Sequence, residues 1–380
     1  MTNKVKNITV TCVMATILFG LAFWSWFKPA DAFSTSERRP LDQFPELSWS
    51  SIFHDDREKT FMNTFESYTL DQFPLRDSFR TLKSIAAFYV FNNMDNNNIY
   101  VQDGYAAQIE YPVKEDSLSY AAEVFKSAYK GYVNPSAKAY FTVVPDKGYF
   151  LAEKNGYLSM DYAHFFKLMQ EKMDFAKYID ITGDLSIDDY YKTDTHWRQE
   201  NLVDIAKKLA GEMGVTLSGE YTENTLNHPF YGVYYGQSAL PLPADELKYL
   251  TNDILDGCKV YNYQTGETMG IYDMEKAYGK DPYEIFLSGN MTAVKITNPN
   301  ATTNKRLVIF RDSFGASLAP LLAEGYRDII ILDIRYASMQ NINSFKDASG
   351  KPLMVDLKTA TDVLYVYSTL VLNNSGELKK

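Results

Sequence analysis

The chain is poor in cysteine, with two in 380 residues. Cys12 lies inside a long apolar stretch near the amino terminus, so Cys258 has no partner for an intrachain disulfide. A chain of this length buries a large core without such a bond. Cys258 opens an apolar run and is predicted to be a buried strand residue rather than a nucleophile.

The chain also lacks a basic surplus and a recognisable phosphate-binding loop. The formal net charge is -10, and no basic stripe is present to neutralise phosphates, which argues against a nucleic-acid partner. No glycine-rich loop follows a predicted strand, which argues against a nucleotide-binding protein. Aromatic residues are abundant at 15%, and they suit contact with sugars and ordinary core packing alike.

Histidine is scarce too, with four in the chain. His196 stands two residues after Asp194, and no second histidine or cysteine lies nearby at the spacing of a metal site. We therefore expect no metal and no cofactor. The remaining histidines have no obvious acid or serine partner and are predicted to be structural: His54, His164 and His228.

A long uncharged stretch lies near the amino terminus. Residues 8–27 are mostly apolar and match the length of a membrane-spanning helix. Lys4 and Lys6 precede the stretch, so the positive-inside rule places the amino terminus in the cytoplasm and the rest of the chain outside. The alternative is a cleaved signal peptide, since residues 30–32 resemble a small-x-small cleavage site. We favour the single-pass anchor, and both interpretations export the rest of the chain.

The chain divides into three predicted regions, which are an anchor at 1–28, a linker and helical neck at 29–100, and a core domain at 101–380. In the neck, two helical patterns between residues 55 and 93 are broken at Pro74. The core domain contains a loop-rich insertion at about 217–285.

Within the core domain, predicted strands alternate with predicted helices. The strands are short apolar runs at 139–144, 178–181, 306–310, 329–334 and 362–367. The helices are expected at 160–175, 200–213 and 317–324. Continuous apolar runs are typical of parallel strands covered on both faces. The sequence therefore predicts an α/β fold with a doubly wound parallel sheet.

Two short segments carry the chemistry, Asp194-Thr195-His196-Trp197 and Arg311-Asp312-Ser313-Phe314-Gly315. Together they supply an acid, an imidazole and a hydroxyl, which are the parts of a serine nucleophile for acyl transfer. Ser313 follows an apolar run that breaks into a turn, and such a turn lifts a side chain above the carboxyl edge of a sheet. The alternative is that Asp194 and Ser313 are ordinary cap and turn residues.

These segments and three others resemble the DHHW family, which is related to the alginate O-acetylation proteins of the SGNH hydrolase-like group. The matching segments are Asp71–Asp77, Thr193–Trp197, Phe310–Gly315, Asp333–Tyr336 and Asp362–Ser368. The family's name predicts histidine at position 195, where this chain has Thr195. As in the alginate acetylation relatives, the Asp-x-His pair precedes the serine, an order permuted relative to ordinary SGNH enzymes.

The resemblance implies an SGNH hydrolase-like fold for the core domain and a role for each residue of the triad. Ser313 would be the nucleophile, His196 the general base, and Asp194 the residue that orients the imidazole. The backbone amide of Ser313 is a predicted donor of the oxyanion hole. Further candidates for oxyanion donors or substrate contacts are Arg335, Tyr336, Asn373, Asn374 and Trp197.

The resemblance also implies a function. The expected protein is a bacterial O-acetyltransferase, anchored in the cell membrane with its catalytic domain outside, that acts on a secreted or cell-surface polysaccharide. A membrane-bound O-acyltransferase would supply the acyl group. Two alternatives stay open: a carbohydrate esterase with the same triad, and a non-catalytic polysaccharide-binding or assembly component. Transfer and hydrolysis share an acyl-serine and differ in the hydroxyl that is admitted, which the sequence does not show.

Overall fold

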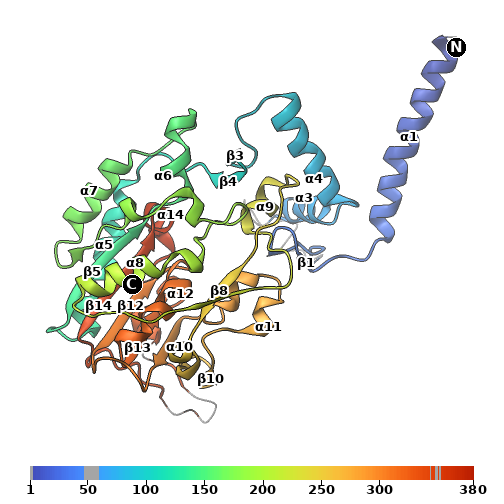
Figure 1. Cartoon of the computed structure of the whole chain (residues 1–380). Helices are drawn as coiled ribbons and strands as arrows, with labels where there is room; N and C mark the ends of the chain where they lie inside the picture. The colour runs from blue at the N-terminus through green and yellow to red at the C-terminus, as the bar shows by residue number, and fades with distance from the viewer. Residues whose placement is uncertain (1–2, 47–59, 343, 347–349, 351) are drawn as a thin grey trace. The chain divides into compact units, whose positions relative to one another are not determined.

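The computed structural model describes residues 3–46, 60–342, 344–346, 350 and 352–380. The chain forms two compact units (Figure 1). Unit 1 comprises Met1–Asn97 and Tyr235–Pro241, and unit 2 comprises Asn98–Tyr234 and Leu242–Lys380. The prediction for His54 falls outside the described residues.

Unit 1 begins with the apolar helix α1, Asn3–Phe27. Among the residues described, α1 is the one helix that is long and apolar enough to cross a membrane, with a mean hydropathy of 1.9. This helix covers the predicted span of 8–27. It fits an anchor and a signal sequence alike, since both are apolar helices near an amino terminus.

The neck of unit 1 contains two helices, as the break at Pro74 predicts. Helix α3 covers Phe61–Asp71 and is capped by the Thr60 hydroxyl, and helix α4 covers Arg76–Ile85. A single π-helical turn, η1 at Ala86–Val90, prolongs α4. A two-residue hairpin precedes these helices, formed by β1 (Phe33–Ser34) and β2 (Arg39–Pro40). Arg39 binds Asp71 with two hydrogen bonds of 2.8 and 2.6 Å, which lowers the pKa of that carboxyl.

Unit 2 is built on a mixed eight-stranded sheet. Its strands lie in the order β10 (Thr268–Met269), β9 (Lys259–Asn262), β11 (Ala293–Thr297), β13 (Asp328–Leu332), β12 (Arg306–Arg311), β14 (Asp362–Ser368), β5 (Lys138–Val144) and β6 (Lys177–Tyr178). The five strands from β13 to β6 are mutually parallel. The three from β10 to β11 pair antiparallel with their neighbours. The predicted parallel sheet is therefore correct for the five strands from β13 to β6 and wrong for the three strands from β10 to β11.

Side chains alternate between the two faces of the parallel strands. Leu307 and Ile309 of β12 pack on one face with helices α8 (Val203–Glu212) and η7 (Ala319–Gly325). Val308 and Phe310 pack on the other face with helices α5 (Glu115–Tyr132) and α7 (Tyr162–Lys172). Both faces are thus covered by helices, as the doubly wound architecture requires.

The carboxyl ends of β12 and β14 form a topological switch point. After β12 the chain continues through α12 (Gly315–Leu318) and η7, which pack on the α8 face. After β14 it continues through α14 (Thr369–Asn373), whose Leu372 packs on the α5 face. Ligand sites of open α/β sheets lie where adjacent strands send their connections to opposite faces. Ser313 lies directly beyond β12, at this point.

The segment predicted as a loop-rich insertion is more ordered than expected. It supplies strands β9 and β10 to the main sheet, together with a separate antiparallel pair, β7 (Thr222–Thr225) and β8 (Lys248–Thr251). Its helices are α9 (Val233–Ser238), α10 (Asp253–Gly257), α11 (Met274–Ala277) and η6 (Pro282–Ile285). The remaining elements are β3 (Ile99–Gln102), β4 (Tyr105–Gln108), α6 (Lys147–Leu151), α13 (Met339–Ile342), and the short turns η2 (Glu153–Asn155), η3 (Thr182–Asp184), η4 (Ile187–Asp189), η5 (Gln199–Asn201) and η8 (Ser375–Glu377).

Candidate active site

The turn after β12 is held by its own side chains. One oxygen of Asp312 accepts the amide of Phe314 at 3.0 Å, and the other accepts the amide and the hydroxyl of Ser368, each at 2.7 Å. Asp312 thus joins the ends of β12 and β14 by accepting backbone amides at or just beyond the ends of both strands. Gly315 is required by close packing, because a Cβ there would lie 2.6 Å from Cβ of Arg311. The turn therefore presents Ser313 in a fixed position.

Asp194, His196 and Ser313 form a hydrogen-bonded row. His196 Nδ1 lies 2.5 Å from Asp194 Oδ1, and His196 Nε2 lies 2.7 Å from Ser313 Oγ. In the tautomer that satisfies both contacts, Nδ1–H donates to the carboxylate and Nε2 accepts the serine proton. Asp194 is fully buried, His196 is nearly so, and Ser313 is half-buried. The arrangement can transfer the serine proton to the imidazole and stabilise the imidazolium that results.

Asp194 is fixed by backbone donors. Its Oδ1 also accepts the amide of His196 at 3.0 Å, and its Oδ2 accepts the amide of Val233 at 2.9 Å. The preceding amide, of Gly232, donates to Thr193 Oγ1 at 2.9 Å. A Cβ at Gly232 would lie 2.2 Å from Cβ of Asp194, so only glycine permits this approach. Sequence reasoning did not identify Gly232 or Val233, since both lie within the segment predicted as an insertion.

Aromatic rings enclose the imidazole. The ring of Tyr283 stacks on His196 with centroids 3.8 Å apart and an interplanar angle of 7°. Phe314 lies at 5.0 Å from the same ring. The hydroxyl of Tyr283 lies 2.9 Å from Ser317 Oγ. Tyr283 therefore restricts the imidazole to one plane, and nothing in its sequence context indicates this role.

A buried lysine and a carboxylate hold the segment that leads to Asp194. Lys147 Nζ donates to the carbonyls of Tyr191 at 3.0 Å and Lys192 at 3.2 Å. Asp245 accepts the amides of Lys192 and Thr193, at 2.8 and 2.7 Å, and the Thr193 hydroxyl at 2.6 Å. Burial lowers the pKa of Lys147 to about 7, although the nearby carboxylates act in the opposite direction.

The other residues expected at the site are engaged elsewhere. Trp197 is fully buried, and its ring nitrogen donates to Phe314 O and Ser317 Oγ, each at 3.0 Å. Trp197 thus stabilises the turn that carries Ser313. Arg335 binds Asp333 with two hydrogen bonds of 2.9 and 2.7 Å, and its guanidinium lies over the ring of the exposed Tyr336. Asp333 raises the pKa of Arg335, against the lowering effect of burial.

The Asn373-Asn374 pair stabilises the end of α14. The Asn373 amide donates to Glu110 Oε1 at 2.6 Å and to Pro112 O at 2.9 Å. Asn374 also donates to Glu110 Oε1, at 3.0 Å. These contacts tie α14 to the segment before α5. In this arrangement the donors of both side chains are directed to Glu110 rather than to Ser313.

The remaining candidates from the sequence lie away from the triad. His164 lies 2.9 Å from Glu115, and His228 lies 2.8 Å from Ala277 O. Cys258 is buried directly before β9, and burial raises the pKa of its thiol to about 11. Within the described part of the chain, no three His, Cys, Asp or Glu side chains gather closely enough to hold a metal ion.

Comparison with known proteins gives matches among solved structures. No family model matches the chain, and no curated protein does. A DHHW family protein from Eubacterium siraeum DSM 15702 superposes with a TM-score of 0.57 and 21% identity, over 75% of this chain and 98% of the other. Bacillus cereus PatB1 superposes with a TM-score of 0.53 and 20% identity, over 72% and 96%. PatB1 with a sulfonyl adduct gives 0.53 and 18%, over 72% and 97%. At these identities the likeness is one of fold, and this chain has the fold of a DHHW family protein.

Proposed function

We propose that this protein is a membrane-anchored, extracytoplasmic O-acetyltransferase that acts on a secreted or cell-surface polysaccharide. The observation that carries the proposal is the row from Asp194 through His196 to Ser313, with contacts of 2.5 and 2.7 Å. The row lies at the switch point of the sheet, where ligand sites of such folds are found. The order of the chain, with Asp194 and His196 before Ser313, fits the permuted arrangement of the alginate acetylation relatives.

The reaction proceeds through an acyl-serine. Ser313 Oγ attacks the acyl carbonyl carbon while its proton passes to His196 Nε2. The tetrahedral intermediate collapses, and the leaving oxygen of the donor takes the proton from His196. A sugar hydroxyl then attacks the acyl-serine, gives its proton to His196, and leaves as the acetyl ester when Ser313 recovers that proton. Asp194 keeps the imidazole in the required tautomer throughout.

The negative charge of each tetrahedral intermediate requires hydrogen-bond donors. The backbone amide of Ser313, on the turn fixed by Asp312, is the first proposed donor. Arg335 and Tyr336 follow β13, the parallel neighbour of β12, so they belong to the same edge of the sheet. Because the guanidinium of Arg335 is bound to Asp333, Tyr336 is the proposed second donor of the two. Each donor lowers the barrier by about 3–4 kcal/mol.

The substrate assignment follows from the resemblance and the amino-terminal helix. A helix of 25 residues suits an anchor that holds the enzyme beside a membrane-bound O-acyltransferase, the proposed source of acyl groups. The adduct in PatB1 also supports the proposal, because sulfonyl groups attach to activated nucleophiles such as the serine of a triad.

The test uses the full chain, purified in detergent, with a chromogenic acetate ester and a short unmodified oligosaccharide. The variants are Ser313→Ala and, as a matched control, Ser119→Ala on the exposed side of α5. A sulfonyl fluoride provides a second readout, since it should label the wild type and the control but not Ser313→Ala.

Three outcomes are distinguished. Ser313-dependent cleavage with acetyl on the sugar establishes the transferase. Ser313-dependent cleavage without acetylated sugar identifies an esterase with the same triad. Equal cleavage and equal sulfonyl labelling in all three folded proteins would refute the acyl-serine and leave a binding or assembly component.

A further inference from the structure

Unit 1 has an apolar helix face that its own described residues leave exposed. Helix α4 and the turn η1 form one continuous helical segment. On a helical wheel at about 100° per residue, Leu75, Phe79, Leu82, Tyr89 and Val90 fall within an arc of roughly 100°, whereas Ile85, Ala87 and Phe88 lie outside that arc. The exposed members of this face, and of the segment that follows, are Leu75, Phe79, Leu82, Tyr89, Val90, Phe91 and Met94. A contiguous apolar surface of this kind marks an interaction site on a soluble unit.

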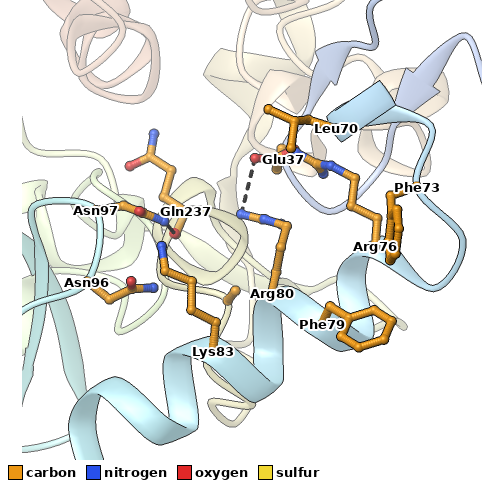
Figure 2. Close-up of a pocket in the computed structure, with 11 residues that line it drawn as sticks. Glu37, Leu70, Phe73, Arg76, Phe79, Arg80, Lys83, Asn96, Asn97 and Gln237 are labelled. Carbon is orange, nitrogen blue, oxygen red and sulfur yellow. Dashed lines mark hydrogen bonds and ion pairs between the residues drawn. The ribbon is translucent and has the colours of Figure 1, made fainter. Parts of the chain in front are cut away.

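A row of cations borders the apolar face. Arg76, Arg80 and Lys83 follow one another at helical spacing and line a pocket of about 590 Å³ (Figure 2). Figure 2 shows their side chains extending from α4, with Arg80 reaching toward Glu37. Glu37 lies 2.5 Å from Arg76 and 3.1 Å from Arg80. Asp77 lies 3.8 Å from Arg76 and 3.6 Å from Arg80, and Asp71 lies 3.3 Å from Arg76. The two arginines are therefore paired within unit 1, and Lys83 is the exposed cation of the row.

The pocket is also apolar on one side. Leu70, Phe73 and Phe79 line it together with the cations. A basic row beside an apolar wall fits an amphiphile with an anionic head, and it is the pattern of helices that lie in the interface of a membrane. A free glycan or a free phosphate would leave the apolar wall exposed to water.

The chain ties this surface to the end of the amino-terminal helix. Asp31 donates its amide to Gln72 Oε1 at 2.8 Å, and Gln72 returns a bond to Asp31 O at 2.9 Å. Asp31 lies four residues after Phe27, the last residue of α1, which is at most about 14 Å of extended chain. Gln72 caps α3 immediately before α4. The residue that contacts Gln72 is therefore held within about 14 Å of the end of α1, which is about two headgroup layers from the point where α1 would leave the hydrocarbon.

We infer that the apolar face of α4 and η1, with the row of Arg76, Arg80 and Lys83, docks on the outer surface of an anionic lipid bilayer. The inference rests on the proposed membrane anchoring by α1. The apolar side chains enter the boundary between headgroups and acyl chains, and Lys83, the exposed cation of the row, lies at the level of the lipid phosphates.

The test places a fluorophore on the full chain in vesicles of mixed zwitterionic and anionic phospholipids. The background is Cys12→Ser, because Cys258 is buried and burial raises the pKa of its thiol to about 11. Leu82→Cys carries the label, and Leu158→Cys is the matched control, since the two leucines are 61% and 60% exposed. Lipids with a doxyl group on the upper acyl chain quench a fluorophore that enters the bilayer.

The expected result is quenching at position 82 that is at least several-fold stronger than at position 158. Equal quenching at the two positions in vesicles that carry the protein would overturn the docking surface. Crosslinking of two protein chains through position 82 would also overturn the docking surface, because a second copy of the chain would then cover the apolar face. Flotation tests the anchor on which the docking rests. Protein that fails to float with the vesicles refutes anchoring and docking together, whereas floating protein with equal quenching at the two positions refutes the docking alone. Sulfonyl labelling of Ser313 reports on the acyl-serine independently.

Discussion

The close approach of Gly232 to Asp194 gives the sharpest prediction. In Gly232→Ala, the new methyl carbon would lie 2.2 Å from Cβ and 2.3 Å from Cα of Asp194. An ordinary van der Waals contact begins at 3.4 Å, so the two segments must separate by about 1.2 Å, the difference between these distances. The atoms in conflict are backbone and Cβ atoms, so no rotamer change relieves the clash.

The separation breaks two hydrogen bonds. The bond from Val233 N to the Asp194 carboxylate is worth about 1.5–3 kcal/mol, and the bond from Gly232 N to Thr193 Oγ1 about 0.5–1.5 kcal/mol. We therefore expect the free energy of unfolding to fall by about 2–4 kcal/mol. A displacement of about 1 Å in the orienting carboxylate should lower kcat by about 10²-fold.

The assay is Ser313-dependent turnover of an acetate ester, together with thermal unfolding of the same sample. Gly131→Ala is the matched control, because Gly131 lies within α5 and a Cβ there meets no atom within 4 Å. The control should keep full activity and gain about 0.5–1 kcal/mol of stability. Wild-type kcat in Gly232→Ala would show that the position of Asp194 does not limit the reaction.

Three further predictions concern the same unit. Asp194→Asn should keep the fold and lower kcat by about 10⁴-fold, measured as ester turnover, because the imidazolium loses its partner; a loss below tenfold would contradict this. Tyr283→Phe keeps the ring stacked on His196 and loses the contact with Ser317, so kcat should stay near wild type while stability falls by about 1 kcal/mol. Tyr283→Leu should lower kcat by about 10²-fold, and equal rates for the two variants would exclude a role for stacking. Because Lys147 has a folded pKa of about 7, lowered from 10.5, the unfolded chain binds more protons between these values, and the free energy of unfolding should rise with pH across that window. Lys147→Met should flatten the rise in denaturant titrations, and equal slopes for the two proteins would count against a buried, titrating amine.

The parts of the fold that the sequence predicts well are those with a strong local pattern. Strands β12, β13 and β14 are continuous apolar runs, and their observed bounds differ from the predicted ones by at most two residues. The break at Pro74 separates α3 from α4, since proline ends a helix by removing a backbone donor. The resemblance to the DHHW family is confirmed at the level of fold.

The antiparallel edge of the sheet and much of the site lie in segments with weak patterns. The apolar run at Cys258 predicts a strand where β9 (Lys-Val-Tyr-Asn) lies, but four residues do not indicate its antiparallel direction, and β10, with two residues, shows no run that predicts a strand. The stacking of Tyr283 and the donation from Val233 depend on tertiary packing alone. Arg335 also illustrates the limit, because its charge is used by Asp333, two residues before it, rather than directed at the serine.

The chain that holds the catalytic carboxylate passes directly into unit 1. Val233 donates to Asp194, and from Tyr235 to Pro241 the chain belongs to unit 1. There the carbonyls of Gly236, Gln237 and Ser238 accept hydrogen bonds from Arg80, Asn97, and both Ser84 and Asn96. A protein cut at the boundary near residue 98 would retain all three triad residues and lose these four donors. In such a shortened chain Val233 would still be present to donate to Asp194, but residues 235–241, which follow it, would lack these hydrogen-bond partners. A crystal structure or an assay of the shortened chain would therefore report on a carboxylate whose backbone donor is less firmly held.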